Sequence, residues 1–206
     1  KAKKVIANDN SAEVIGIYER LQKTSIEEVL SHIGKRIKEY ALSKENQEGY
    51  NSFRDMYNNS EKDPLDLFIL VCYSFNHQIR FNKDGKFNMP FGKNRSAFNE
   101  NIKKNLIEFH EAIKDIIFTV KDFADIKKET LKEGDFVYCD PPYLITCASY
   151  NEQDVWNETE ERRLLSLLDE LNSIGVKFAL SNVIENKGKE NLILKDWSSK
   201  YNVHHL

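Results

Sequence analysis

GDFVYCDPPY, residues 134–143, is a short apolar run that stops at an acid and two prolines. The run from Phe136 to Cys139 predicts a buried strand. Neither proline donates a backbone hydrogen bond and each fixes its own φ, so the chain must turn rigidly where that strand ends. In open α/β sheets, ligands bind at the carboxyl ends of the strands. The stretch therefore predicts an α/β fold with a binding site directly after this strand.

The chemical groups in this turn suit one task, which is to grip a planar base by its amino group and its face. An exocyclic amine is a poor nucleophile because its lone pair is conjugated into the ring. Two acceptors aimed at its hydrogens stabilise the positive charge that develops when a methyl group arrives. We expect the Asp140 carboxylate and the Pro141 carbonyl to be these acceptors, with Pro142 stiffening the turn. Tyr143 would stack on a base flipped out of its duplex. A proline-rich turn beside an ordinary strand is the alternative.

Residues 134–143 resemble the catalytic segment of Dam-type DNA adenine methyltransferases, which transfer a methyl group from S-adenosylmethionine to the 6-amino group of adenine. Three more segments are similar to that family and follow in the same order. They are the strand end at residues 7–10, a recognition hairpin at residues 80–93 and a core strand at residues 178–182. The resemblance spans nearly all of the chain and is closest to the phage-type enzymes.

One departure from the family pattern concerns the start of the chain. The family opens with a lysine-bearing segment and a Phe-x-Gly-x-Gly loop that cradles the methionine part of the cofactor, and neither precedes the apolar run at residues 5–7. The sequence also stops at residues 201–206, where the family continues with further strands. We therefore expect an internal fragment of a longer enzyme, inactive when isolated.

Composition places few limits on function. A hydrophobic fraction of 40% is ordinary for a globular chain, and the net charge of −3 does not by itself indicate a nucleic-acid ligand. No stretch of 18 or more apolar residues predicts a membrane-spanning helix. The three cysteines, Cys72, Cys139 and Cys147, show no metal-binding spacing. We expect reduced thiols, no metal, and a monomeric protein in the cytoplasm of a bacterial or phage-infected cell.

The order of predicted elements divides the chain into two parts. Residues 1–20 and 115–206 alternate strand and helix, which predicts a parallel α/β sheet. Residues 21–114 are mostly helical, with a β-hairpin near residues 79–92 around the turn at 82–85. The resemblance implies the same division, with a Rossmann-like S-adenosylmethionine-dependent methyltransferase core interrupted by a helical target-recognition domain.

The resemblance assigns cofactor contacts to Asp9, Phe123 and Asp140. Asp9 follows a strand, where acids of nucleotide-binding sheets accept hydrogen bonds from ribose hydroxyls. The alternative for Asp9 is that it caps the following helix. Phe123 matches the position that packs on the cofactor adenine, although a core role is the alternative. Asp122 is a weaker candidate nearby.

The segment from Arg80 to Lys104 is the predicted DNA-binding region. It holds seven basic and two acidic residues, a net +5, and such a cluster can neutralise phosphates. Arg80 is expected to contact a guanine edge directly, or else to pair with Asp84 on the surface. The resemblance adds recognition positions at Asn76, Gln78 and Pro90, and Lys93 and Arg95 are expected to contact phosphates.

The leading hypothesis is a site-specific enzyme that methylates adenine in double-stranded DNA, with GATC as the target that the resemblance implies. Two other classes remain open. The protein is a non-catalytic DNA-binding remnant if no glycine-rich loop belongs to it. It acts on RNA or on a protein amide if the acidic di-proline turn serves another amine or amide.

Overall fold

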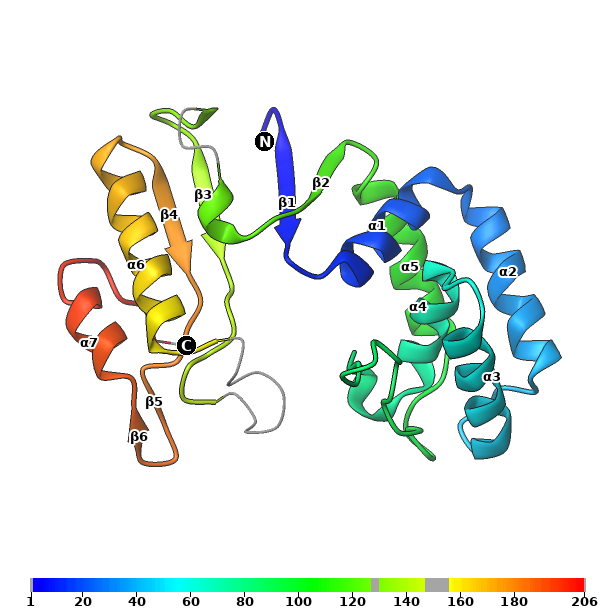
Figure 1. The fold of residues 1–206 in the computed structure, drawn as a ribbon. Coiled ribbons are helices and arrows are strands. Elements are labelled where there is room, and N and C mark those ends of the chain that lie inside the picture. The colour runs from blue at the N-terminus through cyan, green and yellow to red at the C-terminus, as the bar shows by residue number, and fades with distance from the viewer. Residues whose placement is uncertain (1, 127–129, 147–155, 206) are drawn as a thin grey trace. The chain divides into compact units, whose positions relative to one another are not determined.

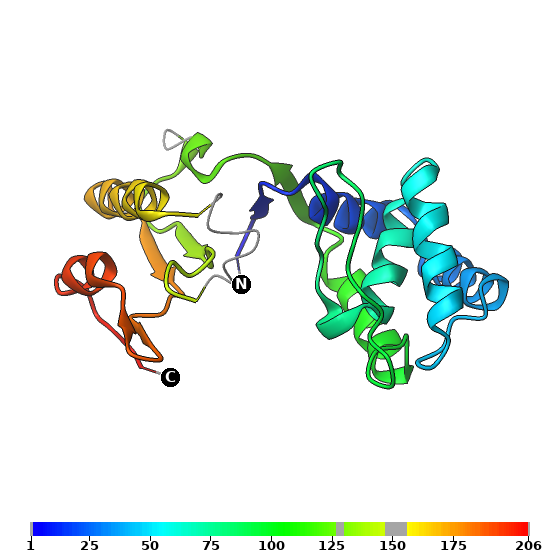
Figure 2. The ribbon, with the colours of Figure 1, turned by 60° about the horizontal axis from the view of Figure 1, so that its bottom comes forward.

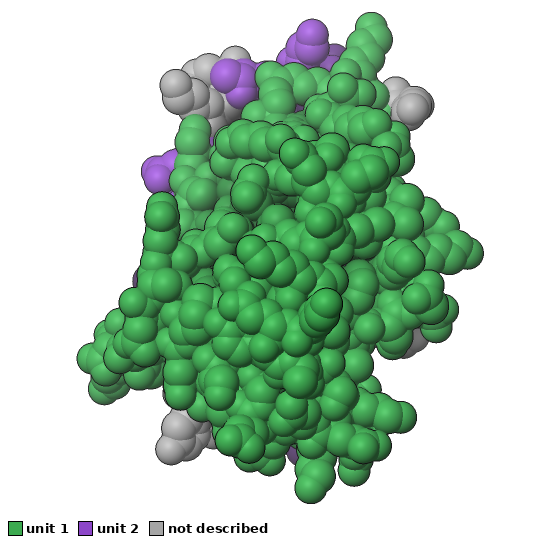
Figure 3. Space-filling view, turned by 90° about the vertical axis from the view of Figure 1, so that its right-hand side faces the viewer, with its two compact units in different colours: residues 1–121 green, residues 122–206 purple. Residues whose placement is uncertain are grey.

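The computed structural model of the protein describes residues 2–126, 130–146 and 156–205 (Figure 1). The chain forms two compact units, residues 1–121 and 122–206, and each unit has its own hydrophobic core. Figure 3 shows one face of unit 1 in a space-filling view, with residues 1–121 in green. Helices and short sheets occur in both units, so the fold class is mixed α/β, as predicted.

Unit 1 begins with strand β1 (Val5–Asp9) and ends with strand β2 (Ile116–Val120). The two strands pair in parallel, with Val5 opposite Ile116 and Asp9 opposite Val120. The chain between them forms helices α1 (Ala12–Lys23), α2 (Ile26–Glu39), α3 (Gln47–Asn59), α4 (Pro64–Tyr73) and α5 (Glu100–Ala112), and a short 3-10 helix, Phe75–His77. Residues 10–115 therefore leave one strand and return to its neighbour, a connection that an inserted helical region would make.

Local sequence signals explain where these helices begin. Ser25 accepts a hydrogen bond from the Glu28 N–H while the Glu28 carboxylate accepts from Ser25, so the Ser-x-x-Glu pattern of the sequence forms a capping box at the start of α2. Asp63 caps α4, and Pro64 occupies its first turn, where no backbone donor is lost. Because α4 is apolar on almost every side, it forms the centre of the unit 1 core, with Ile69 and Leu70 fully buried.

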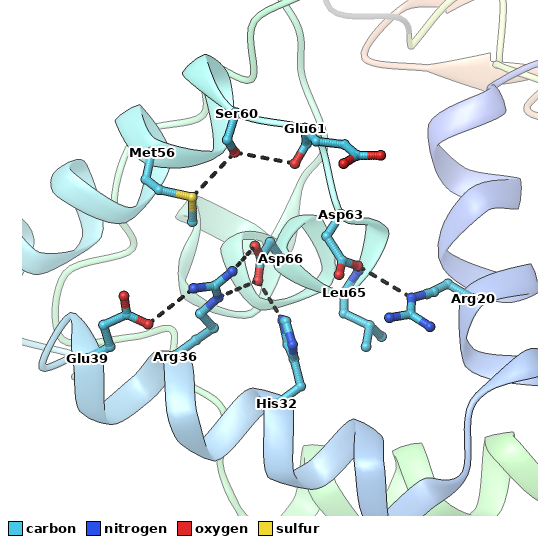
Figure 4. A network of polar contacts seen from close by, with 10 residues as sticks. All are labelled: Arg20, His32, Arg36, Glu39, Met56, Ser60, Glu61, Asp63, Leu65 and Asp66. Carbon is cyan, nitrogen blue, oxygen red and sulfur yellow. Dashed lines mark hydrogen bonds and ion pairs between the residues drawn. The ribbon is translucent and has the colours of Figure 1, made fainter.

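One charged side chain, Asp66, lies inside that apolar helix, with only 2% of its surface exposed. Arg36 donates to both of its carboxylate oxygens, each at 2.9 Å, and His32 Nε2 lies 2.7 Å from Oδ1 (Figure 4). The hydrogen bonds that Arg36 donates to Asp66 raise the pKa of Arg36. The network joins α2 to α4 through a bidentate ion pair, which fixes the distance and the rotation between these helices.

Unit 2 contains a two-stranded parallel sheet of β3 (Phe136–Cys139) and β4 (Lys177–Leu180). Helix α6 (Glu158–Ser173) packs on one face of this sheet through its leucines, against Val137, Cys139, Phe178 and Leu180. The other elements are a 3-10 turn (Phe123–Asp125), the small hairpin of β5 (Glu185–Asn186) and β6 (Lys189–Glu190), and helix α7 (Leu192–Ser198).

The predicted burial of the strand that precedes Asp140 is only half correct. Val137 and Cys139 face α6, but Phe136 and Tyr138 are 63% and 60% exposed. Successive side chains of a strand point to opposite faces, and in the described residues helices of unit 2 pack on one face of this sheet. Within the described part of unit 2, the strand is therefore apolar on both sides and covered by helices on one.

The structure also bears on the expected division of the chain, on membrane-spanning helices and on the cysteines. The expected boundary at residue 20 falls within α1, and the division into a 1–20 and 115–206 core with a 21–114 insertion stays a prediction. In the described part of the chain, no helix is long and apolar enough to cross a membrane. Cys147 lies outside the described residues, and Cys72 and Cys139 are free thiols.

Replacing Arg36 with alanine should destabilise unit 1 by about 3 kcal/mol, because it leaves the buried Asp66 carboxylate without its cation. Glu39→Ala is the matched control, since it removes an exposed partner of the same arginine and should cost about 0.5 kcal/mol or less. Urea unfolding followed by circular dichroism measures both. Equal losses in the two variants would contradict a dominant role for the buried pair.

Candidate functional site

The acidic di-proline turn directly follows β3. The Cys139 carbonyl accepts from Ser181 N–H at 2.9 Å, so pairing with the neighbouring strand continues to the residue before Asp140. The Tyr143 hydroxyl donates to Asp140 Oδ1 at 2.9 Å, and this hydrogen bond raises the pKa of Tyr143. This hydrogen bond closes the turn and holds Asp140 and Tyr143, which were predicted to act together, in contact.

This arrangement leaves two acceptors unused. Among the described residues, neither Asp140 Oδ2 nor the Pro141 carbonyl accepts a hydrogen bond. Asp140 and Pro142 are exposed, and Pro141 and Tyr143 are half-buried. A carboxylate oxygen and a carbonyl oxygen on one rigid turn form the pair of acceptors that the sequence predicted for an amino group. Their catalytic role stays a prediction.

Phe123 lies at the edge of the unit 2 core. Its ring centroid is 5.7 Å from that of Trp156, and the Arg163 guanidinium carbon is 5.1 Å from the Phe123 centroid. Arg163 also pairs with Asp122 at 3.1 Å. Phe123 therefore packs partly against the core, which was the alternative to a cofactor contact. The contact of Phe123 with a cofactor stays a prediction.

Asp9 ends β1 in unit 1. Its Oδ1 accepts from Ser11 N–H at 2.7 Å, and Ser11, rather than Asp9, is the N-cap of α1. The helix-capping alternative for Asp9 is therefore wrong. Among the described residues, no hydrogen bond reaches the second carboxylate oxygen of Asp9. That oxygen is a suitable acceptor for a ribose hydroxyl.

The predicted hairpin is a turn with antiparallel contacts and no regular strands. Phe81 and Phe87 form one bridge and Ser74 and Phe91 another, and Gly85 takes a φ of 68° in the turn. These residues form part of the long loop of unit 1 seen in Figure 2. The hairpin prediction is confirmed in its turn and its pairing direction, and wrong in expecting extended strands.

Arg80 is held by Asn88 across the hairpin. Its Nε donates to Asn88 Oδ1 at 2.8 Å and its Nη2 to the Asn88 carbonyl at 2.9 Å. The alternative pairing with Asp84 is therefore wrong. Two of the five guanidinium N–H groups are used, and the Nη1–Nη2 edge keeps donors for a bidentate contact.

The hairpin is attached to one face of α3 through its main chain. Asn58 accepts from Phe87 N–H at 2.8 Å and donates to the Phe87 carbonyl at 2.9 Å. Tyr50 and Arg54 both donate to the Met89 carbonyl, at 2.9 Å and 3.3 Å. Because these three helix residues are spaced by four, they form a single row along α3.

The remaining predicted DNA contacts are exposed on unit 1. Asn76, Gln78, Pro90, Lys93 and Arg95 are all exposed, whereas Arg80 is half-buried. Asn76 has a left-handed backbone with a φ of 54°, and the Arg95 guanidinium lies 5.8 Å from the Phe75 ring centroid. Their contact with DNA stays a prediction.

Sequence reasoning missed two hydrogen-bonded residues of the unit 2 core, Trp156 and Glu161. Glu161 is fully buried and accepts from Trp156 Nε1 at 2.8 Å. The signal was its position, since Glu161, Leu164 and Leu168 share the apolar face of one helix.

Tyr150, a further candidate for closing over a base, lies outside the described residues. In the described part of the chain, no three His, Cys, Asp or Glu side chains group as metal ligands.

The mixed α/β fold and the acidic di-proline turn are consistent with a methyltransferase that acts on an amino group. The model of the D12 class N6 adenine-specific DNA methyltransferase family matches residues 1–206. The chain belongs to this family.

Individual relatives agree with this assignment. Type II methyltransferase M.FokI of Planomicrobium okeanokoites is 50% identical over 100% of this chain and 32% of its own length. Modification methylase StsI of Streptococcus sanguinis is 42% identical over 100% of this chain and 33% of its own length. The DNA N-6-adenine-methyltransferase of Escherichia phage P1 is 28% identical over 86% of this chain and 24% of its own length. The chain thus spans about a third of the first two relatives.

Asn58→Ala should loosen the hairpin, because it removes both hydrogen bonds to the Phe87 main chain. We expect hydrogen exchange of the Phe87 amide to accelerate at least about tenfold, the effect of losing one to two net hydrogen bonds. Asn59→Ala is the control, since the one hydrogen bond of the Asn59 side chain among the described residues is to the Asp55 carbonyl on its own helix. Unchanged exchange in Asn58→Ala would show that α3 does not hold the hairpin.

Proposed function

We propose that the protein methylates the 6-amino group of an adenine flipped out of double-stranded DNA, with S-adenosylmethionine as the methyl donor. The observation that carries this proposal is the turn after β3, in which Tyr143 is bonded to Asp140 while none of the described residues donates to Asp140 Oδ2 or to the Pro141 carbonyl. Membership in the adenine-specific family supports the choice of adenine and DNA.

The donor would be held by residues at the ends of two strands and at the Phe123 turn. Asp9 has a carboxylate oxygen available for the ribose hydroxyls, and Phe123 offers a half-buried aromatic ring for the adenine. Asp140 is assigned a contact with the methyl donor as well as with the target adenine. The bound donor supplies a methyl group on a sulfonium, which is its own leaving group.

The contribution of the chain to catalysis is orientation and charge stabilisation. Asp140 Oδ2 and the Pro141 carbonyl accept one hydrogen bond each from the two N–H groups of the target amine. These hydrogen bonds favour a more tetrahedral nitrogen and stabilise its developing positive charge. Tyr143, tied to Asp140 through its hydroxyl, presents its ring to the base. Pro142 keeps the turn rigid because its φ is fixed.

Target reading is assigned to the hairpin of unit 1. Asn88 orients Arg80 so that its outer guanidinium edge meets O6 and N7 of a guanine in the major groove. Asn76, Gln78 and Pro90 line the same region, and exposed Lys93 and Arg95 contact phosphates. This assignment requires a guanine within the target sequence. The four-base site GATC, implied by family resemblance, is the first target to test.

The same proposal covers architecture and setting. The two parallel strand pairs belong to a Rossmann-like core, and residues 21–114 are a helical target-recognition insertion between neighbouring strands. The similarity to M.FokI and to StsI, both named as modification enzymes or Type II methyltransferases, supports a restriction–modification system.

Asp140→Asn should lower kcat at least about 100-fold, because the new amide donor would face the donor hydrogens of the target amine. The assay is transfer of labelled methyl to duplex DNA by the protein at its full natural length. Asp135→Asn is the control, since the Asp135 carboxylate lies in the turn before the same strand and, among the described residues, accepts only from Lys132 N–H. Near-normal transfer by Asp140→Asn would overturn the proposed chemistry.

The same assay tests the substrate with duplexes that contain GATC, duplexes that keep only GAT, and duplexes with the site scrambled. Label on GATC alone supports the four-base site, and label on GAT duplexes supports the guanine contact without the fourth base. RNA and protein competitors complete the series, because label on them would point to another amine substrate.

Arg80→Ala should relax selectivity at the guanine, with a loss of about 1–3 kcal/mol of discrimination at that position alone. Lys93→Ala should weaken binding to all duplexes alike and reduce the salt slope by about one. Equilibrium binding to single-base variants of the duplex at several salt concentrations measures both effects. If the two variants behave alike, the assignment of Arg80 to base reading is wrong.

A further inference from the structure

Glu161 is a fully buried acid whose partners are all neutral N–H donors. None of its surface is exposed, and it lies in the first turn of α6 on the face that packs against the sheet. Its carboxylate accepts from Trp156 Nε1 at 2.8 Å, Asn191 Nδ2 at 2.9 Å and Asn182 Nδ2 at 3.1 Å. A buried carboxylate is tolerated only when it is bonded in this way, so the three donors and the acid constrain one another.

The three donors come from separate segments of unit 2. Trp156 precedes α6, Asn182 follows the carboxyl end of β4, and Asn191 is the N-cap of α7, where its Oδ1 accepts from Leu194 N–H at 3.0 Å. Glu161 therefore joins the entry to α6, the end of the strand beside β3 and the start of α7.

The Trp156 ring carries this constraint to Phe123. The two ring centroids are 5.7 Å apart, and two residues beyond Glu161 the Arg163 guanidinium lies over Phe123 and pairs with Asp122. The first turns of α6 thus fix the Asp122–Phe123 segment by two routes. One route runs through the hydrogen bond to Trp156 and the other through Arg163.

We infer that Glu161 is a positioning residue for the methyl donor, acting through Trp156 on the Phe123 ring. This inference rests on the proposed function, which assigns Phe123 to the adenine of S-adenosylmethionine. Because Glu161 touches neither the acidic di-proline turn nor the target base, it sets donor affinity and leaves the chemical step unchanged.

The same helix supplies a matched control. Asp169 also accepts from an indole, Trp197 Nε1 at 3.0 Å, and from the Tyr201 hydroxyl at 2.6 Å and Lys200 Nζ at 2.7 Å. These partners belong to α7 and the residues after it, and Phe123 is not among them. Asp169→Asn therefore disturbs a similar hydrogen-bond cluster on α6 without touching the proposed donor site.

Glu161→Gln is the informative variant because its shape is nearly unchanged. A glutamine has one acceptor oxygen and one NH2 group, so in either orientation an NH2 group must face an N–H donor of Trp156 or of the two asparagines. Residues 1–206 hold two tryptophans, so Trp197→Phe, combined with phenylalanine at any tryptophan outside these residues, leaves Trp156 as the single reporter of emission. The protein is used at its full natural length, with S-adenosylmethionine as the titrated probe.

Calorimetric titration should give about tenfold weaker donor binding for Glu161→Gln, with kcat at saturating donor within about twofold of the unsubstituted protein. In the Trp197→Phe background the Trp156 emission should shift to longer wavelength in Glu161→Gln. Asp169→Asn should leave the donor affinity and the Trp156 emission unchanged, even if it lowers the melting temperature.

Equal donor affinity in Glu161→Gln and the unsubstituted protein would overturn the inference while leaving the proposed function intact. Equal weakening by Asp169→Asn would overturn it too, because the effect would then be general destabilisation. If the unsubstituted protein itself binds no S-adenosylmethionine, the proposed function fails, and the inference fails with it. Comparing the unsubstituted protein with the variant distinguishes these failures.

Discussion

A carboxylate removed from water must be surrounded by hydrogen-bond donors, and this requirement determines how the helices of both units are joined. In unit 1, Asp66 is 2% exposed and is held by the guanidinium of Arg36 and the ring of His32. In unit 2, Glu161 has no exposed surface and is held by an indole and two amides. The first acid binds two helices together, and the second binds three loops to one helix.

The groups proposed to meet DNA and donor are exposed or half-buried, and the groups that hold them in place are half-buried or buried. Asp140 projects from a turn that its own Tyr143 closes, at the edge where two parallel strands end. Arg80 is oriented by Asn88, within a hairpin that α3 holds by its main chain. Such a division lets a site keep its geometry while its contacting atoms stay accessible to a large substrate.

Features decided by neighbouring residues were predictable from the sequence. The Ser25–Glu28 capping box, the Asp63-Pro64 helix start and the turn after Cys139 depend on short-range chemistry, and the structure contains all three. Features decided by packing were not. Asn88, rather than Asp84, became the partner of Arg80 because the register of the hairpin sets which side chain lies opposite. The exposure of Phe136 depends on which faces of the sheet are covered, and strand composition does not encode that.

The attachment of the hairpin to α3 has a consequence for how such a protein changes over time. Tyr50, Arg54 and Asn58 bond to carbonyl and amide groups of the hairpin, which every amino acid except proline provides in full. The exposed side chains of the hairpin, unlike the buried Phe87 and Met89, are therefore free to vary without loosening this anchorage. A lineage could exchange the bases that the hairpin is proposed to read by substitution at its exposed positions alone, and its scaffold would need no compensating change.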